Sequence, residues 1–91
     1  MSAENLFAPG APRRLHVRFF AVLREQAGRA TLEVETAAAT PTELYAELQT
    51  RLPLSFPPAL LRVSVNDRYA EMTSALGPGD RVVFIPPVAG G

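Results

Sequence analysis

Cysteine and lysine are both absent from the 91 residues of the chain, and histidine occurs once. The absence of cysteine excludes disulfides, thiolate metal sites and a cysteine nucleophile. The absence of lysine leaves no side-chain amine to form a Schiff base or to accept an isopeptide bond. The usual side-chain nucleophiles and bases are therefore nearly missing, which argues against a self-contained enzyme.

An excess of charge of either sign is also missing. Nine basic residues balance nine acidic ones, so the net charge gives no reason to expect nucleic acid or an anionic membrane as a partner. No apolar run approaches the ~20 residues of a membrane-spanning helix. The N-terminus lacks the basic-then-apolar order of a signal peptide. We therefore expect a cytoplasmic protein.

The length of the chain suits one small domain. Such a domain buries only about 60–65% of the surface that its unfolded chain exposes, so a deep active site would remove much of its core. Residues 1–13 mix alanine, proline, glycine and polar residues without periodicity, which is typical of a mobile leader. We expect a folded domain at residues 14–85 and an extended tail at residues 86–91.

Much of the folded domain alternates apolar and polar residues, the pattern of strands that bury one face. In the first such segment, Leu15, Val17 and Phe19 alternate with His16 and Arg18. This pattern predicts strands at residues 15–21, 30–35, 61–66 and 81–85, with a short edge strand at 68–70.

Two segments have helical periodicity instead. Residues 22–28 change period and end in glycine, which predicts one or two helical turns with a C-cap. Residues 40–43, Thr-Pro-Thr-Glu, form a capping box, and leucines follow on one apolar stripe at i, i+4 and i+8 from Leu44. We expect this main helix to continue until Pro53.

The predicted order is strand, strand, helix, strand, short strand, strand, with a single helical turn at residues 73–76 before the last strand. A helix with one apolar stripe must cover one face of the sheet. A right-handed crossover places the first and last strands side by side in the centre. The sequence therefore predicts an α+β fold of the β-grasp (ubiquitin-like) type, a mixed sheet of four to five strands with one main helix packed on one face.

Three large apolar side chains are expected on the face that the helix leaves open. If Val82 and Phe84 pack under the helix, Val83 and Ile85 point to the opposite side, and the same phase turns Phe20 outward. An exposed apolar cluster often marks a partner site. We expect Phe20, Val83 and Ile85 to form a partner interface; the alternative is that the leader or the short helical segments cover them.

The last six residues, Pro-Pro-Val-Ala-Gly-Gly, are the most informative segment. Two prolines favour an extended start, and six extended residues reach up to ~20 Å beyond the sheet. The final glycines have no Cβ, so the terminus can enter a channel too narrow for any side chain. We expect tail insertion by Pro86, Pro87, Val88, Ala89 and Gly90.

The α-carboxylate of Gly91 is then the one reactive group presented far from the bulk of the chain. A free carboxylate is a poor acyl donor until ATP activates it. The scattered glycines of the sequence do not form a GxxxxGK phosphate-binding loop, so activation would require another protein.

Several short motifs recur in one known family. They are Phe19-Phe20-Ala21 leading into Leu23-Arg24-Glu25 and Gly28, then Val65-Asn66, Leu76 with Gly79-Asp80, and the block Phe84-Ile85-Pro86-Pro87-Val88-Ala89-Gly90-Gly91. With these motifs, the stretch from about Leu15 to Gly91 resembles the small, sulfur-carrier subunit of molybdopterin synthase. The terminal block is specific, whereas the other motifs are typical of the wider sulfur-carrier group. The leader departs from the family pattern, in which the first strand begins almost at the start.

The resemblance implies a chemistry centred on Gly91. In the family, an E1-like adenylyltransferase uses ATP to adenylate the terminal carboxylate, and a sulfur donor protein converts the acyl-adenylate into a thiocarboxylate. The tail then inserts into the large subunit, in an assembly of two small and two large subunits. There it donates sulfur to cyclic pyranopterin monophosphate in molybdenum cofactor biosynthesis. The chain itself would bind no cofactor.

The remaining polar candidates have ordinary structural explanations. His16 is expected as a solvated side chain on an outward strand position. Asp67 and Asp80 are expected to form turns rather than to bind a metal ion. We therefore assign no metal site.

Three alternatives share the predicted fold. A thiazole-forming sulfur carrier of thiamine synthesis has the same Gly-Gly end, but the Phe-Ile-Pro-Pro-Val block favours the molybdopterin branch. A ubiquitin-like protein modifier would be joined to target lysines through Gly91, and an interaction module would have an inert tail. Conjugates on other proteins would indicate the modifier, and a free thiocarboxylate would indicate the carrier.

Overall fold

The structure, a computed structural model, describes residues 12–87; residues 1–11 and 88–91 lie outside the described part. Most of the leader predicted at residues 1–13 and of the tail predicted at residues 86–91 therefore lies outside it. Within the described part, no helix has the length and apolar character needed to cross a membrane.

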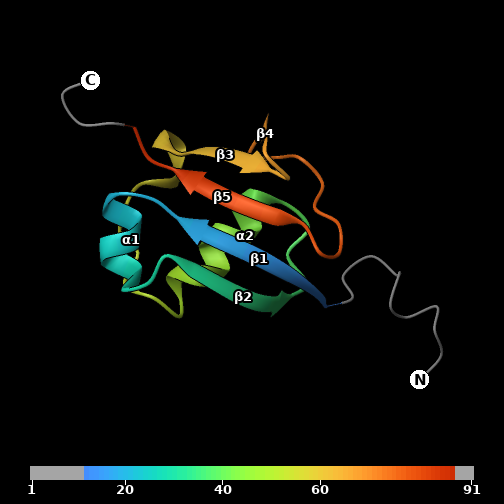
Figure 1. Cartoon of the computed structure of the whole chain (residues 1–91), viewed down its shortest axis with the longest axis horizontal. Coiled ribbons are helices and arrows are strands. Elements are labelled where there is room, and N and C mark those ends of the chain that lie inside the picture. Colours follow the sequence, from blue (N-terminus) through green and yellow to red (C-terminus); the bar gives the residue numbers. More distant parts are fainter. Residues whose placement is uncertain (1–11, 88–91) are drawn as a thin grey trace.

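Five strands and three helical segments follow one another in the described residues (Figure 1). In chain order they are β1 (Arg13–Phe19), α1 (Val22–Ala27), β2 (Thr31–Thr36), α2 (Pro41–Gln49), the 3-10 helix η2 (Pro58–Leu60), β3 (Arg62–Val65), β4 (Arg68–Ala70) and β5 (Arg81–Ile85). All five predicted strands are present, within two residues of the expected bounds. β1 starts at Arg13 and ends earlier than expected, because Ala21 (φ 51°) turns the chain into α1.

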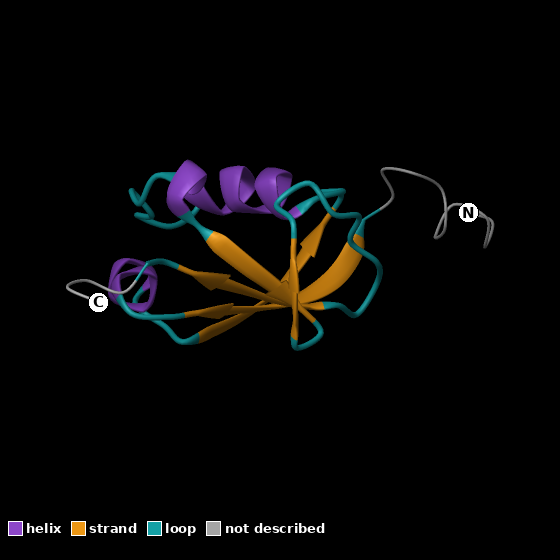
Figure 2. Cartoon of the chain, turned by 90° about the horizontal axis from the view of Figure 1, so that it is seen from above, coloured by secondary structure: helices purple, strands orange, loops and turns teal. Residues whose placement is uncertain are grey.

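The sheet has the strand order β2-β1-β5-β3-β4. β1 and β5 run parallel at its centre, and the other neighbours are antiparallel. Figure 2 shows α2 on one side of the sheet, whereas α1 lies at the end of the strands from which the C-terminal segment leaves. This arrangement confirms the predicted β-grasp fold.

The core lies between α2 and the sheet. Alternate residues of β1 and β5 point into it, and each is at most 1% exposed: Leu15, Val17, Phe19, Val82 and Phe84. Leu44, Tyr45 and Leu48 of α2 cover them and are fully buried. The predicted stripe of α2 and the predicted inward phase of both central strands are therefore confirmed.

The end of α2 differs from the prediction, because the helix stops at Gln49 and not at residue 52. The N–H of Arg51 and the N–H of Leu52 both donate to the carbonyl of Leu48, at 3.0 and 2.8 Å. The chain tightens there and leaves the helix, yet Leu52 still packs against the core. The stripe marks which residues are buried, but it does not fix the residue at which the helix ends.

The helical turn predicted at residues 73–76 is wrong. A turn closes earlier, where the Ser74 N–H donates to the Glu71 carbonyl at 2.9 Å. The Leu76 N–H then donates to the Ala39 carbonyl at 2.9 Å, and the Arg13 guanidinium donates to the Leu76 carbonyl. Bonds to distant segments replace the local bonds that a helical turn would need.

The predicted N-cap at Thr40 is confirmed, but the reciprocal bond of the capping box goes to Ala39, one residue before the N-cap. The Glu43 N–H donates to the Thr40 hydroxyl at 3.2 Å, and the Ala39 N–H donates to the Glu43 carboxylate at 3.0 Å. Pro41 occupies the first helical position, where its missing N–H removes no bond. Gly28 closes α1 in the left-handed conformation at φ 76°, as its position after residues 22–27 predicts.

We expect Thr40→Ala to lower the free energy of unfolding by about 1 kcal/mol, because an N–H of the first turn of α2 loses its acceptor. Thr40→Ser keeps a hydroxyl and should retain most of that stability. Urea unfolding curves of both variants test this. Equal midpoints for Thr40→Ala and the native chain would show that the cap contributes nothing.

Candidate functional site

The face of the sheet opposite α2 is the surface that the sequence marks as a partner site. Figure 1 looks onto this face, with α2 behind the strands. Val82 and Phe84 are fully buried on the α2 side, so the alternation of β5 turns Val83 and Ile85 to the open face. Both side chains are half-buried there.

Phe20 and Ile85 meet at one end of the open face. Phe20 follows β1 directly and is 43% exposed. The two side chains line one hollow of about 720 Å³, whose other apolar members include Phe56, Pro86 and Pro87. Val83 lies two residues before Ile85 on β5 and lines a different hollow. The three predicted interface residues therefore share a face, but only two of them share a hollow.

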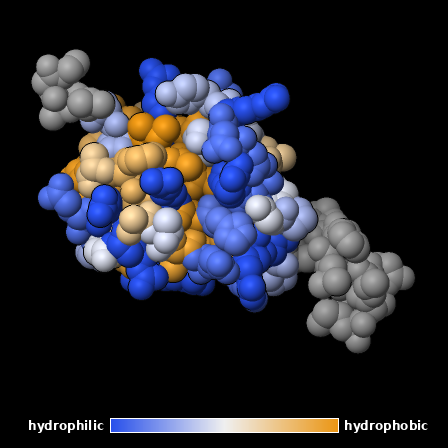
Figure 3. Space-filling view, in the orientation of Figure 1, coloured by the Kyte–Doolittle hydropathy of each residue, from blue (hydrophilic) through white to orange (hydrophobic). Residues whose placement is uncertain are grey.

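The first residues of the predicted tail belong to the same end of the sheet. Pro86 is buried and Pro87 is exposed. Figure 3 shows hydrophobic residues gathered on the part of the face from which this segment leaves, and mostly hydrophilic residues toward the other end. The other residues of the predicted tail lie outside the described part: Val88, Ala89, Gly90 and Gly91.

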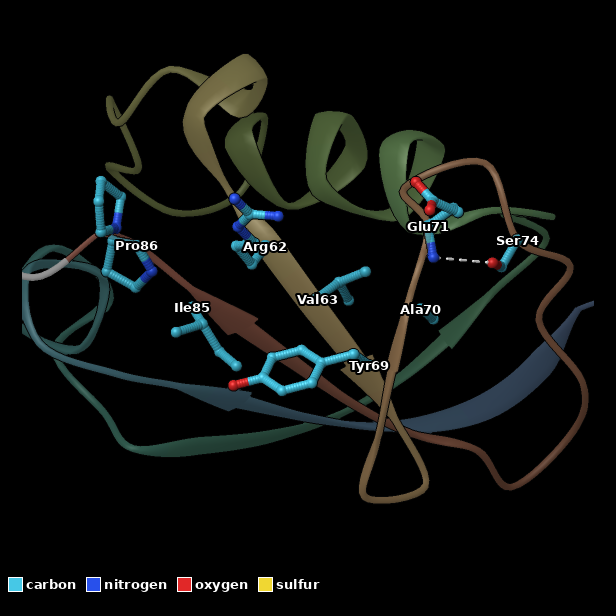
Figure 4. Close-up of a pocket in the computed structure, with 9 residues that line it drawn as sticks. Arg62, Val63, Tyr69, Ala70, Glu71, Ser74, Ile85 and Pro86 are labelled. Carbon is cyan, nitrogen blue, oxygen red and sulfur yellow. Dashed lines mark hydrogen bonds between the residues drawn. The ribbon is translucent and has the colours of Figure 1, made fainter.

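A second hollow of about 770 Å³ lies beside the same two prolines, toward β3 and β4 (Figure 4). Arg62, Tyr69 and Ile85 line it. Tyr69 is 81% exposed, and its Cα pairs with that of Ser64 across the β3–β4 hairpin. Tyr69 was not among the predicted interface residues, although alternation along β3 and its hairpin would have placed it on the open face.

Phe56 is a second residue of this surface that the sequence did not single out. It lies in the irregular segment between α2 and η2, where no periodicity assigns a side chain to a face. No pattern in the sequence could therefore have identified Phe56 as part of this surface. Only the path of the loop brings it to the hollow of Phe20 and Ile85.

Tyr45 supports this end of the sheet from the closed side. Its ring packs edge-on against Phe84, with 5.2 Å between the ring centroids. Its hydroxyl donates to the Phe56 carbonyl at 2.9 Å, which holds the loop that supplies Phe56 to the hollow. Burial raises the pKa of Tyr45 above its ordinary value of 10.0, because the phenolate would lose its hydration.

Charged side chains toward the other end of the face neutralise one another. Arg14 of β1 lies 3.1 Å from Glu35 of β2. Arg81 of β5 lies 2.5 Å from Asp67, in the turn between β3 and β4. This half of the face is polar and charge-balanced, in contrast to the half that carries Phe20 and the prolines.

The predicted roles of the single histidine and of the turn aspartate Asp80 agree with the structure. His16 is exposed and lies 3.8 Å from Glu33. The Asp80 carboxylate accepts from the Gly77 N–H at 2.7 Å and from the Asn66 side-chain amide at 2.9 Å, so it fastens two turns together. Between residues 12 and 87, no three acidic or histidine side chains gather closely enough to hold a metal ion.

Comparison with known proteins assigns the chain to a family. The model of the ThiS family matches residues 17–91. Over 80 residues the chain is 34% identical to the molybdopterin synthase sulfur carrier subunit of Haemophilus influenzae, a match that covers 85% of this chain and 99% of that protein. The resemblance drawn from the terminal block is thereby confirmed.

Solved structures share the fold. SAMP1 from Haloferax volcanii matches with a TM-score of 0.71 and 27% identity, over 86% of this chain and 99% of that one. A chain from the complex of subunits 1 and 2 of molybdopterin-converting factor from Helicobacter pylori matches with a TM-score of 0.61 and 26% identity, over 86% and 99%. Both likenesses agree with the β-grasp topology described above.

We expect Tyr45→Phe to keep the ring packing but to lose the bond to the Phe56 carbonyl, at a cost of about 1 kcal/mol in the free energy of unfolding at neutral pH. The pKa of Tyr45 is higher in the folded chain than in the unfolded chain, so the folded chain is favoured as long as the phenol keeps its proton. This contribution is complete below pH 10 and is lost as the pH rises above it.

Unfolding free energies at neutral pH and above pH 10 test this expectation. The native chain should lose more stability than Tyr45→Phe over that interval, because only the native chain has the buried phenol. Parallel losses in the two proteins would show that Tyr45 does not carry the pH dependence.

Proposed function

The chain belongs to the ThiS family, and we propose that it works as the sulfur-carrier subunit of molybdopterin synthase. In this proposal Gly91 carries sulfur as a thiocarboxylate and donates it to cyclic pyranopterin monophosphate during molybdenum cofactor biosynthesis. The chain would be the sulfur-donating part of a sulfurtransferase complex and would not be catalytic alone.

One observation carries the proposal: the family match runs through the whole terminal block to Gly91, and the chain enters that block at the apolar end of the open face. Pro86 is buried against the domain, so the segment beyond it starts from a fixed point. A partner that covers Phe20 and Ile85 would therefore meet the start of the tail in the same docking step.

The chemistry needs only a carboxylate from this chain. An E1-like partner joins the Gly91 carboxylate to AMP from ATP and releases pyrophosphate. A sulfur donor protein then supplies sulfur at the oxidation level of sulfide, which attacks the acyl carbon and displaces AMP, so that a thiocarboxylate remains. The absence of cysteine is compatible with this role, because the sulfur is held on the terminal carbonyl carbon and needs no thiol of the chain.

The residues before Gly91 would guide it into the partner. Two prolines restrict the backbone where the tail begins, which lowers the entropy that docking must remove. Val88 and Ala89 offer small apolar contacts, and Gly90 allows close approach of the partner's backbone. ATP is bound by the activating partner in this scheme, and no cofactor is assigned to this chain.

The large synthase subunit is the proposed partner of the open face, in an assembly of two small and two large subunits. The Helicobacter pylori complex of subunits 1 and 2 supports a partner of this kind, since one of its chains shares the fold of this one. The open face combines an apolar end with an exposed aromatic ring, which suits a docking surface.

A ubiquitin-like modifier is the second candidate, favoured by the likeness to SAMP1, a small archaeal modifier protein. In that role the activated Gly91 carboxylate would form an isopeptide bond with a lysine of another protein. The mass of the chain isolated from its native host separates the two functions. A free chain with one terminal oxygen replaced by sulfur supports the carrier, and Gly91 linked to other proteins supports the modifier.

We expect Ile85→Asp to weaken binding to the large subunit at least ~30-fold, because a carboxylate would lose its hydration in the centre of the contact. Folding should suffer less, since Ile85 is only half-buried on the open face. Ala46→Asp, on the exposed side of α2, is the matched control. Equal binding by the two variants would exclude Ile85 from the interface.

We expect deletion of Gly91 to leave the unfolding midpoint nearly unchanged and to lower sulfur delivery at least ~100-fold. Deletion moves the carboxylate back by one residue, ~3.5 Å, which productive chemistry does not tolerate. One added residue displaces it the other way, and Gly90→Val adds a side chain where the partner's channel accepts none. Both changes should be nearly as severe.

Two assays test the Gly91 prediction: adenylation by the activating partner with ATP, and product formation with the large subunit. Ala46→Asp serves again as the control for surface changes outside the tail. If the chain without Gly91 still accepts AMP and delivers sulfur at the native rate, the carboxylate of Gly91 is not the reactive group and the carrier function is wrong.

A further inference from the structure

Two arginines flank the apolar strip that Val83 and Ile85 form on the open face. Arg18 of β1 pairs in register with Val83, and Arg62 of β3 pairs in register with Ile85. Both arginines are exposed. The strip on β5 therefore lies between one positive charge on each neighbouring strand.

These two arginines differ from the other two that point to this face. Arg14 and Arg81 form ion pairs with carboxylates of the domain. Arg18 and Arg62 form none with any carboxylate of residues 12–87. The two arginines of the face that have no carboxylate partner among residues 12–87 thus both lie beside the apolar strip.

Local contacts hold the charge of Arg18 at the strip. The Arg18 guanidinium lies over the ring of Phe20, 5.2 Å from its centroid, which is a cation–π contact. Glu71 lines the same hollow as Arg62, but Figure 4 shows it at the opposite end of that hollow. Among residues 12–87, Arg62 therefore has no carboxylate partner in this hollow.

A partner that buries this strip must approach both guanidinium groups. Residues paired across neighbouring strands have Cβ atoms only about 5 Å apart, so Val83 and Ile85 cannot be covered without their arginine neighbours. A buried charge without a partner is strongly unfavourable. A wholly apolar docking surface would be repelled here, whereas carboxylates would form strong charge-assisted bonds with both arginines.

We propose that the surface that docks on this face has an apolar centre with one carboxylate on each side, one for Arg18 and one for Arg62. The inference rests on the proposed function, which makes the large synthase subunit the occupant. The net charge of zero does not reveal the charge of these two arginines, because it sums the charges of the whole chain, including the ion pairs at the other end of the face.

The test is the association rate with the large synthase subunit from the same organism, at ~0.05 M and ~0.15 M salt. The double variant Arg18→Glu/Arg62→Glu should associate at least ~10-fold more slowly at low salt, and it should lose the salt dependence shown by the native chain. Arg18→Gln and Arg62→Gln should each give a smaller decrease of a few-fold. Arg51→Gln removes one charge from the other side of the sheet and is the matched control. Unfolding curves of all variants confirm that each is folded.

The outcomes separate this inference from the proposed function. If the native chain binds but the variants of Arg18 and Arg62 associate as fast as it does, the carboxylates are absent and the inference is wrong, while the carrier function stands. If Arg51→Gln lowers the association rate as much as Arg18→Gln and Arg62→Gln do, the effect comes from net charge alone, and the inference is also wrong. Failure of the native chain to bind the large subunit overturns both proposals.

Discussion

The parallel pairing of β1 with β5 is the constraint on which the rest of the molecule depends. It brings residues 16–19 beside residues 81–84, from opposite ends of the domain. A parallel pair cannot be closed by a hairpin, so the chain must cross over, and α2 is left on one face. Because parallel strands end at the same edge of a sheet, Phe20 after β1 and Pro86 after β5 emerge together. The apolar surface and the start of the tail coincide for this reason.

The open face shows why a net charge describes a surface poorly. Glu33 and Glu35 both lie on the edge strand β2, within reach of Arg14 but on the far side of β1 from the apolar strip. Sheet register thus decides which charges cancel. The net charge of zero rightly gives no case for nucleic acid, since a broad basic surface is missing. It conceals a local positive charge beside β5 that a protein partner can recognise.

Much of the fold follows from the sequence, and the exceptions share one cause. Alternation along residues 15–19 and 81–85, the N-cap at Thr40 and the left-handed cap at Gly28 are local signals, and all three are confirmed. The end of α2, the 3-10 helix at residues 58–60 and the path of residues 73–76 depend on tertiary contacts instead. Leu76 bonds to Ala39 and to Arg13, which no local pattern encodes. The outward phase of β5 was predictable, whereas Phe56 was not, because only its loop path brings it to the hollow.

In the proposed function, the described residues serve recognition of partners, and the chemistry takes place at Gly91, outside residues 12–87. On the open face, Glu33, Glu35 and Asp67 are engaged with basic neighbours. An activated carboxylate at the end of the chain needs none of these groups, since the partners supply ATP binding and the sulfur donor. In the proposed function the domain has two tasks: to present a surface that its partners bind, and to start the tail from a fixed point. Pro86 connects these two tasks. It is buried at the edge where β1 and β5 end and lines the same hollow as Ile85, so a partner that docks on Ile85 also contacts the first residue of the predicted tail.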